Sequence, residues 1–153
     1  MANTYTQMYV QIVFAVQGRH NLITSKNRDE LEKYICGIIL NKKAKPLAIY
    51  CNPDHIHILI GLHPAIAVSD LTRDIKANSS KFINNKKWVS GKFCWQDGFG
   101  AFTYSRSQID AVAKYINNQP EHHKKRLFKA EYLEILKKHD VDYNEQYLFE
   151  WYE

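Results

Sequence analysis

Two histidines separated by one residue carry the clearest chemical signal in this sequence. His55 and His57 stand in a stretch, residues 52–61, where apolar residues alternate with the two-residue period of a β-strand. Successive side chains of a strand point to opposite faces, so both imidazoles project from the same face. Two neutral imidazoles held that close can bind one divalent metal ion. The alternative is a pair of polar side chains on the solvated face of a half-buried strand.

A tyrosine and a glutamine on a later helix can complete such a site. An apolar stripe predicts a helix over about residues 107–118, and Tyr115 and Gln119 lie four residues apart along one edge of that stripe. The phenol could meet a bound metal, and the amide could supply a third oxygen ligand. Packing alone is the usual role of a tyrosine beside a helix stripe. The residue before a proline is also pushed away from helical geometry, so Pro120 leaves the direction of Gln119 open.

The elements that would position these residues follow the order strand, helix, strand, strand, helix, strand, and then helices. We expect strands over residues 8–16 and 47–51, from His55 onward, and up to Tyr104, with helices from about Asn27, Ser69, Ser107 and Leu127. Asn27 with Glu30, and Ser107 with Asp110, are expected to cap their helices.

This order predicts an α+β fold, with an antiparallel sheet of the ferredoxin-like or RNA-recognition-like type and helices packed mainly on one face. A chain of 153 residues is expected to be one domain over residues 1–153. Within it we expect a core over about residues 5–120 and a C-terminal helical tail over about residues 121–153.

Composition places the chain among soluble globular proteins. Hydrophobic residues make up 45% and charged residues 24%, which does not fit a disordered chain. No apolar run approaches the length of a membrane span, and no signal-peptide pattern opens the sequence, so we expect a cytoplasmic protein without membrane contact. Three cysteines without a Cys-x-x-Cys pair indicate reduced thiols rather than a disulfide framework or a zinc site.

Positive charge is concentrated in two segments. The net charge is +5, and residues 71–92 hold six lysines and arginines against the single acidic residue Asp74. A second basic cluster lies within residues 124–129. Clustered positive charge favours a polyanion through counterion release. A solvated helix face and a favourable helix dipole explain the same lysines equally well.

Together these residues resemble the single-domain tyrosine transposases of the HUH class, of the insertion sequence 200/605 type, including their repeat-associated relatives. The stretch Pro53-Asp54-His55-Ile56-His57-Ile58-Leu59-Ile60 resembles the two-histidine motif that names the class. Tyr115-Ile116-Asn117-Asn118-Gln119 resembles the helix with a nucleophilic tyrosine and a glutamine four residues later. Segments near Tyr9–Phe14 and Trp95–Phe102 are also similar, so the resemblance covers nearly the whole chain.

The resemblance implies a DNA transposase that cleaves and rejoins single-stranded DNA at hairpin-bearing element ends. Tyr115 would be the nucleophile and would form a 5′-phosphotyrosine intermediate. His55, His57 and Gln119 would hold one Mg²⁺ or Mn²⁺. The implied partners are single-stranded DNA with a hairpin and a second copy in a homodimer. The implied location is the cytoplasm of a bacterium or archaeon, in association with the nucleoid. Whether Tyr115 acts in cis or in trans stays open.

For the DNA itself, basic residues would hold the backbone and an aromatic residue would stack on an unpaired base; these are Arg73, Lys76, Lys81, Lys87 and Trp88. Two alternative functions stay open. One is a non-catalytic or domesticated module that binds single-stranded nucleic acid without metal, and the other is a repeat-associated nuclease. A phosphoesterase with two His-x-Ser/Thr motifs is excluded because the sequence contains no such pair.

Overall fold

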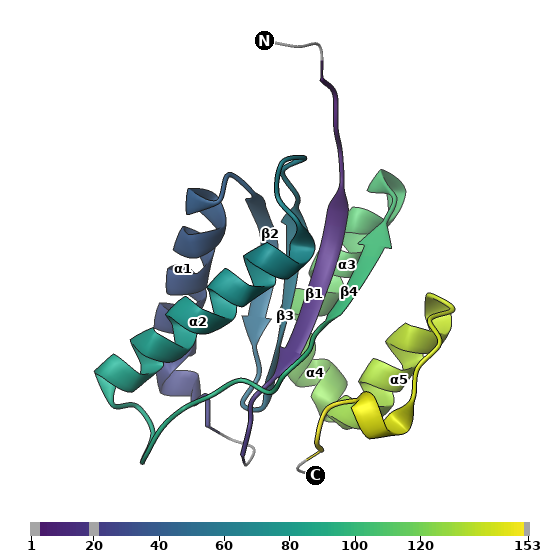
Figure 1. The fold of residues 1–153 in the computed structure, drawn as a ribbon. Helices are drawn as coiled ribbons and strands as arrows, with labels where there is room; N and C mark the ends of the chain where they lie inside the picture. The colour runs from purple at the N-terminus through teal and green to yellow at the C-terminus, as the bar shows by residue number, and fades with distance from the viewer. Residues whose placement is uncertain (1–3, 19–21, 152–153) are drawn as a thin grey trace.

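Four antiparallel strands form one sheet at the centre of the molecule. The computed structural model describes residues 4–18 and 22–151, and in this part of the chain the strand order is β2-β3-β1-β4 (Figure 1). The strands are β1 (Tyr9–Ala15), β2 (Lys45–Cys51), β3 (His55–Gly61) and β4 (Gly100–Tyr104). The predicted α+β class, with an antiparallel sheet of ferredoxin-like element order, is confirmed.

Alternation along the central strands gives the sheet two chemically different faces. Strands β1 and β3 pair antiparallel, with Val13 opposite His57 and Ala15 opposite His55. Every residue of β3 except the last is buried. Because successive side chains point to opposite faces, Ile56 and Ile58 project away from the face that carries the histidines.

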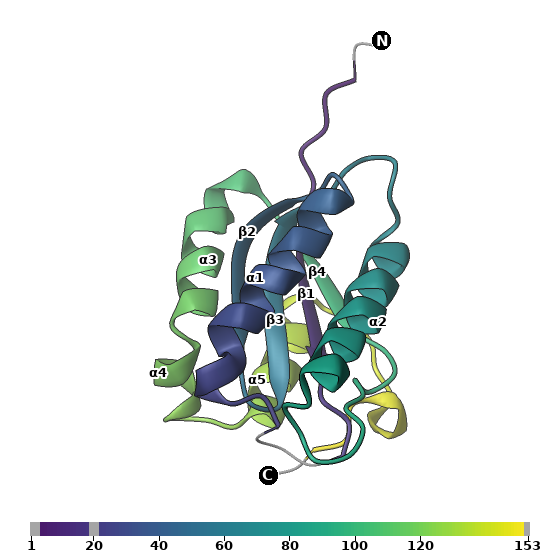
Figure 2. The same ribbon diagram turned by 90° about the vertical axis from the view of Figure 1, so that its left-hand side faces the viewer.

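The two longest helices cover the isoleucine face of the sheet. These are α1 (Ser25–Asn41) and α2 (Val68–Lys86), which lie side by side over the strands (Figures 1 and 2). Leu31 and Ile35 of α1 and Leu71 and Ile75 of α2 are fully buried in the same cluster as the isoleucines of β3. This face is therefore sealed by apolar side chains.

Three shorter helices lie over the histidine face: α3 (Ile109–Asn117), α4 (Gln119–His123) and α5 (Phe128–Lys138) (Figure 2). Ile109 and Ile116 of α3 pack against Leu59 of β3. On α5, Tyr132 lies directly over Gly100, where an added Cβ would collide with the tyrosine ring. Helices thus cover both faces, with the two longest on one of them, and α5 is packed against the sheet. The predicted division near residue 120 stays a prediction.

Two predicted helix caps are displaced toward the N-terminus, from Asn27 to Thr24 and from Ser107 to Ser105. Helix α1 begins at Ser25 because the carbonyl of Thr24 already accepts the amides of Asn27 and Arg28, which puts Asn27 inside the first turn. Ser105, not Ser107, forms a capping box with Gln108, at a 3₁₀ turn (Arg106–Gln108) that precedes α3. Both predictions were wrong because an extra turn forms before each expected start. A second 3₁₀ turn (Glu145–Tyr147) follows α5.

Within the described residues, none of the helices combines the length and the apolar character that crossing a membrane requires. The thiols of Cys36, Cys51 and Cys94 are all free. Burial raises the pKa of the Cys51 thiol well above its usual value, so this thiol stays protonated and acts as a small apolar side chain.

Candidate active site

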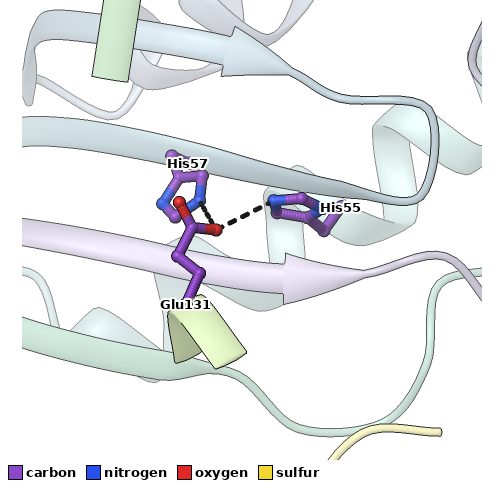
Figure 3. A group of neighbouring side chains, drawn as sticks. All are labelled: His55, His57 and Glu131. Carbon is purple, nitrogen blue, oxygen red and sulfur yellow. Dashed lines mark hydrogen bonds and ion pairs between the residues drawn. The ribbon is translucent and has the colours of Figure 1, made fainter. Parts of the chain in front are cut away.

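His55 and His57 lie fully inside the protein. Their exposed fractions are 1% and 0%, and their ring centroids are 5.1 Å apart. Both project from β3 toward Glu131 of α5 (Figure 3). A pair of polar side chains on a solvated face would be exposed, so that alternative is excluded.

Each imidazole is oriented through its Nδ1 atom by a neighbouring polar side chain. His55 Nδ1 donates to Asp54 Oδ1 at 2.7 Å. Gln11 Nε2, on β1, donates to Nδ1 of His57 at 2.9 Å, and Gln11 Oε1 accepts from the hydroxyl of Tyr104 at 2.6 Å. Asp54 therefore does more than shape the turn before β3. With Nδ1 held, the Nε2 atom of each ring faces the same point in the interior.

The residue at that point is Glu131 of α5, which was not among the site residues predicted from the sequence. Its Oε1 lies 3.0 Å from Nε2 of His57 and 3.3 Å from Nε2 of His55 (Figure 3). The side chain of Glu131 is 0% exposed. These three residues form a cluster of one carboxylate and two imidazoles that could hold a metal ion.

Burial and charge oppose each other within this cluster. Burial acts to raise the pKa of Glu131, but His57, His123 and His55 outweigh it and hold that pKa far below its usual value. Burial lowers the pKa of His57 despite the nearby Glu131. Burial acts in the same sense on His55, but the carboxylates of Asp54 and Glu131 prevail and raise its pKa. The carboxylate of Glu131 is therefore ionised, and among the two histidines of β3 only His55 has a pKa raised toward the charged form.

Tyr115 meets the cluster from α3, as predicted. Its hydroxyl donates to Oε2 of Glu131, and its ring lies edge-on to His57 with centroids 6.1 Å apart. Burial and the Glu131 carboxylate raise the pKa of Tyr115, so the phenol is held protonated. The hydroxyl and both histidines belong to the same chain.

Gln119 reaches the same region by an unexpected route. The helix that carries Tyr115 ends at Asn117, and Gln119 begins the separate helix α4, where Pro120 suits the first turn. Gln119 is 0% exposed, and its Nε2 donates to Oε2 of Glu131 at 3.1 Å. Its Oε1 accepts from Asn52 Nδ2 at 3.0 Å. The same oxygen lies 3.0 Å from Nε2 of His123, so the amide oxygen that was predicted to bind metal already has two partners.

A cavity of about 620 Å³ opens beside Tyr115, between α3 and α5. Polar and basic side chains line much of it, among them Gln11, Tyr104, Gln108, Arg126, Lys138 and His139. Arg126 pairs with Glu134, and Lys138 pairs with the same carboxylate at 3.0 Å. The cavity therefore offers room and positive charge next to the phenol.

The predicted DNA-contacting residues lie on or just after α2, over the opposite face of the sheet; they are Arg73, Lys76, Lys81, Lys87 and Trp88. Lys76 Nζ donates to the carbonyl of Gln96 at 2.8 Å and to that of Gly98, so it holds the loop before β4. Arg73 is exposed and lies 3.4 Å from Asp74. The ring of Trp88 packs edge-on against Phe82. The structure does not bring any of the five next to the histidines.

The chain is similar to known transposases in sequence and in fold. A family model described as "Transposase IS200 like" matches residues 4–119. The ISDra2 transposase TnpA of Deinococcus radiodurans is 22% identical over 118 residues, which cover 74% of this chain and 84% of that protein.

Two solved structures share the fold. One is a protein of Deinococcus radiodurans R1 assigned as a transposase, with a TM-score of 0.61 and 20% identity, over 78% of this chain and 95% of that one. The other is a REP-associated tyrosine transposase bound to a REP hairpin, with a TM-score of 0.60 and 17% identity, over 80% of this chain and 73% of that one. The extent of the family match settles the assignment: this chain belongs to the IS200-like transposase family.

Proposed function

We propose that this protein cleaves and rejoins single-stranded DNA beside a hairpin, with Tyr115 as the nucleophile. The observation that carries the proposal is the convergence of the Tyr115 hydroxyl, two buried imidazoles and the Glu131 carboxylate at one point. The cavity beside Tyr115 supports it, because a phosphate needs space and nearby positive charge. The relative bound to a REP hairpin supports the choice of a hairpin substrate.

The donor set fits a divalent cation such as Mg²⁺ or Mn²⁺. His55 and His57 both direct Nε2 at a carboxylate oxygen. His55 donates from Nδ1 to Asp54, as metal-binding histidines usually do, and Nδ1 of His57 is held by the side-chain amide of Gln11. An oxygen ligand comes from Gln119, as the sequence predicted, or from Glu131. When bound, the cation polarises a phosphate oxygen of the substrate and stabilises negative charge on the departing 3′ oxygen.

The residues of this chain would act in one sequence of bond changes. The phenolic oxygen of Tyr115 attacks the phosphorus, forming a tyrosine–phosphate bond as the bond from phosphorus to the 3′ oxygen breaks. Oε2 of Glu131 would accept the phenolic proton, and the departing 3′ oxygen would take a proton from water. The proton that Glu131 then releases neutralises the hydroxide left by that water. The phosphotyrosine conserves the bond, so a 3′-hydroxyl from a second strand restores a phosphodiester and frees Tyr115 without ATP.

Tyr115 would act in cis. Its hydroxyl donates to Glu131 and its ring faces His57 of the same chain, so a second copy need not supply the nucleophile. A homodimer stays a prediction. Mixing Tyr115→Phe protein with His57→Ala protein should restore no cleavage, because neither chain then carries a complete site. Recovery of cleavage in the mixture would place Tyr115 in the partner's site.

The hairpin would be held by exposed basic side chains of α2 and the segment after it, chiefly Arg73, Lys81 and Lys87, with Trp88 near their end. Lys76 would contribute indirectly, because its ammonium group already binds two carbonyls of the loop before β4. A DNA hairpin on this side would leave its single-stranded flank to reach the face that carries Tyr115.

Covalent capture tests the proposal. Wild-type protein, a hairpin oligonucleotide with a single-stranded flank and Mn²⁺ should yield an adduct that survives denaturing gel electrophoresis. Tyr115→Phe should form no adduct while binding the same hairpin with unchanged affinity. An adduct from Tyr115→Phe would refute the assignment. Hairpin binding by the wild type with neither adduct nor metal dependence would instead identify a non-catalytic binding module.

A further inference from the structure

The third oxygen of the donor set has two candidates in the structure, and their orientations differ. We infer that Glu131 of α5 is the third protein ligand of the divalent cation, and that Gln119 positions Glu131 rather than binding the cation. This assignment rests on the proposed function for the role of the cation. It adds a ligand from α5, which lies beyond residues 4–119, the part of the chain that the family model matches.

The three donor atoms have the separations expected of ligands on one small ion. Glu131 Oε1 is 3.0 Å from Nε2 of His57 and 3.3 Å from Nε2 of His55, and all three donors lie within 4.8 Å of one another. Atoms bound at about 2.1 Å to one ion lie about 3.0 Å apart when the angle between them is 90°. The site therefore needs only small side-chain movements to close on a cation.

The crowding of nitrogen atoms around one oxygen also points to a cation. Three imidazole nitrogens lie within 3.3 Å of Glu131 Oε1, from His55, His57 and His123. A buried carboxylate is costly unless a positive charge is nearby. A divalent cation among these donors supplies that charge while leaving the imidazoles neutral.

The two oxygens of Glu131 have separate partners. Oε1 faces the imidazoles, whereas Oε2 accepts from Tyr115 and from Nε2 of Gln119. An amide binds a hard cation through its oxygen, and the Gln119 oxygen is engaged with Asn52 and with Nε2 of His123. Gln119 is thus placed to fix the carboxylate, with Oε1 left to face the cation.

Both histidines can present Nε2 as a basic nitrogen while Nδ1 keeps its partner. At His55, the cation would replace the hydrogen bond that Nε2 accepts from Asn52 at 3.2 Å. His55 donates from Nδ1 to Asp54, which leaves Nε2 as its basic nitrogen in the neutral ring. At His57, the Gln11 amide donates to Nδ1. Turning that amide end for end keeps His57 and Tyr104 as its partners and lets Nδ1 donate, so that Nε2 becomes the basic nitrogen.

Helix α5 is anchored firmly enough to hold a ligand in place. Phe128 stacks on His55 with ring centroids 3.7 Å apart and planes 9° from parallel. Tyr132 occupies the space that Gly100 leaves open, and Leu136 is buried one turn later. The apolar residues on both sides of Glu131 therefore fix its position against the sheet.

Binding of Mn²⁺ to the protein alone, without DNA, tests the ligand set. Loss of the free Mn²⁺ electron paramagnetic resonance signal gives the affinity of the wild type, Glu131→Ala, Glu131→Gln and Gln119→Ala. Glu131→Ala should weaken binding by at least about 10-fold, and by more than Gln119→Ala does, because loss of a direct ligand exceeds loss of its neighbour. Glu145→Gln, which removes an exposed carboxylate from the segment after α5, should leave the affinity unchanged.

Thermal melts by circular dichroism show which variants fold. If Glu131→Ala does not fold, Glu131→Gln keeps the size and hydrogen bonds of the side chain and should still weaken Mn²⁺ binding. Two results overturn the inference: no Mn²⁺ binding by the wild type, or binding that persists in both Glu131 variants and is lost in Gln119→Ala. The Glu131 carboxylate would then fill the space beside the imidazoles in place of a cation.

Parallel adduct assays separate this inference from the proposed function. A wild type that forms the adduct, with Glu131 variants that bind Mn²⁺ normally, refutes only the ligand assignment. A wild type that binds Mn²⁺ through Glu131 but never forms an adduct refutes the proposed cleavage and leaves the ligand assignment standing.

Discussion

The two faces of one sheet are built on opposite principles. Strand β3 sends Ile56 and Ile58 to a face that α1 and α2 cover with apolar side chains. The same strand sends His55 and His57 to a face where α5 places an ionised carboxylate at 0% exposure. Because the pleat alternates, consecutive residues of one strand face an apolar core on one side of the sheet and a polar cluster on the other.

The difference shows where stability is exchanged for chemistry. Buried polar groups are costly unless each has a partner. In the part of the chain that the structure describes, Oγ1 of Thr72 on α2 is the one buried side-chain polar atom without a hydrogen-bond partner. Every buried side-chain polar atom at the histidine face is therefore paired. Such a complete network is typical of a site that holds its groups ready for a reaction.

A substitution that disrupts only the polar face should have the largest effect, on the rate of adduct formation. Replacing His57 by Asn should lower the rate of adduct formation by about 1000-fold or more, because the loss removes several kcal/mol of transition-state stabilisation. Adduct yield over time on a hairpin oligonucleotide measures this loss. Circular dichroism should report an unchanged fold, and an unchanged rate would mean that the histidines have no role in the chemistry.

A substitution that disrupts only the apolar face should have the next largest effect, on the free energy of unfolding. Ile58 is fully buried on the face of β3 opposite to the imidazoles, so Ile58→Ala should lower the free energy of unfolding by about 2–5 kcal/mol. Urea denaturation measures this change. Per folded molecule, adduct formation should stay within about 2-fold of the wild type, because the Ile58 side chain points to the face opposite to the imidazoles. A large loss of rate in folded protein would show that the two faces are coupled.

Removing one charge at the edge of the polar face should have a smaller effect, on the affinity for Mn²⁺. Asp54→Asn keeps a hydrogen-bond partner for His55 but removes its charge, so Mn²⁺ affinity should fall by about 10–100-fold. Isothermal titration measures the affinity. Asp74→Asn is the matched control, since Asp74 pairs with Lys42 over the isoleucine face. Equal effects from the two substitutions would rule out a specific role for Asp54.

The smallest effect concerns the outer surface of α2. Arg73→Ala should weaken hairpin binding only a few-fold and reduce the salt dependence of binding by about 1 unit of slope, as expected for one lost phosphate contact. Fluorescence anisotropy at several salt concentrations measures both quantities. A slope that does not change would place the hairpin elsewhere on the molecule.

Much of this arrangement is predictable because it follows local periodicity. The alternation around His55 and His57 predicted the strand and the shared face, and the stripe of α3 predicted the direction of Tyr115. The helix caps at Asn27 and Ser107 were less predictable because short turns compete for the same residues. Gln119 was uncertain for a physical reason, since Pro120 starts a new helix with its own direction.

Glu131 was missed because it meets the histidines only after the chain has folded back. It is far from β3 in sequence, in a segment that we expected to be a tail. One signal was present. Phe128, Tyr132 and Ile135 form the apolar stripe of α5, and Glu131 falls within that stripe. A charged residue on the buried side of an amphipathic helix requires a buried partner, and here the partners are the two histidines.

Mapping the covalent bond between protein and DNA shows directly whether Tyr115 is the nucleophile. Wild-type protein is trapped with a hairpin oligonucleotide and Mn²⁺, digested with a protease and a nuclease, and analysed by tandem mass spectrometry. We expect a single modified peptide in which Tyr115 carries a 5′-linked nucleotide through a phosphodiester. A nucleotide on any other of the ten tyrosines, or no modified peptide despite cleavage of the DNA, would contradict it.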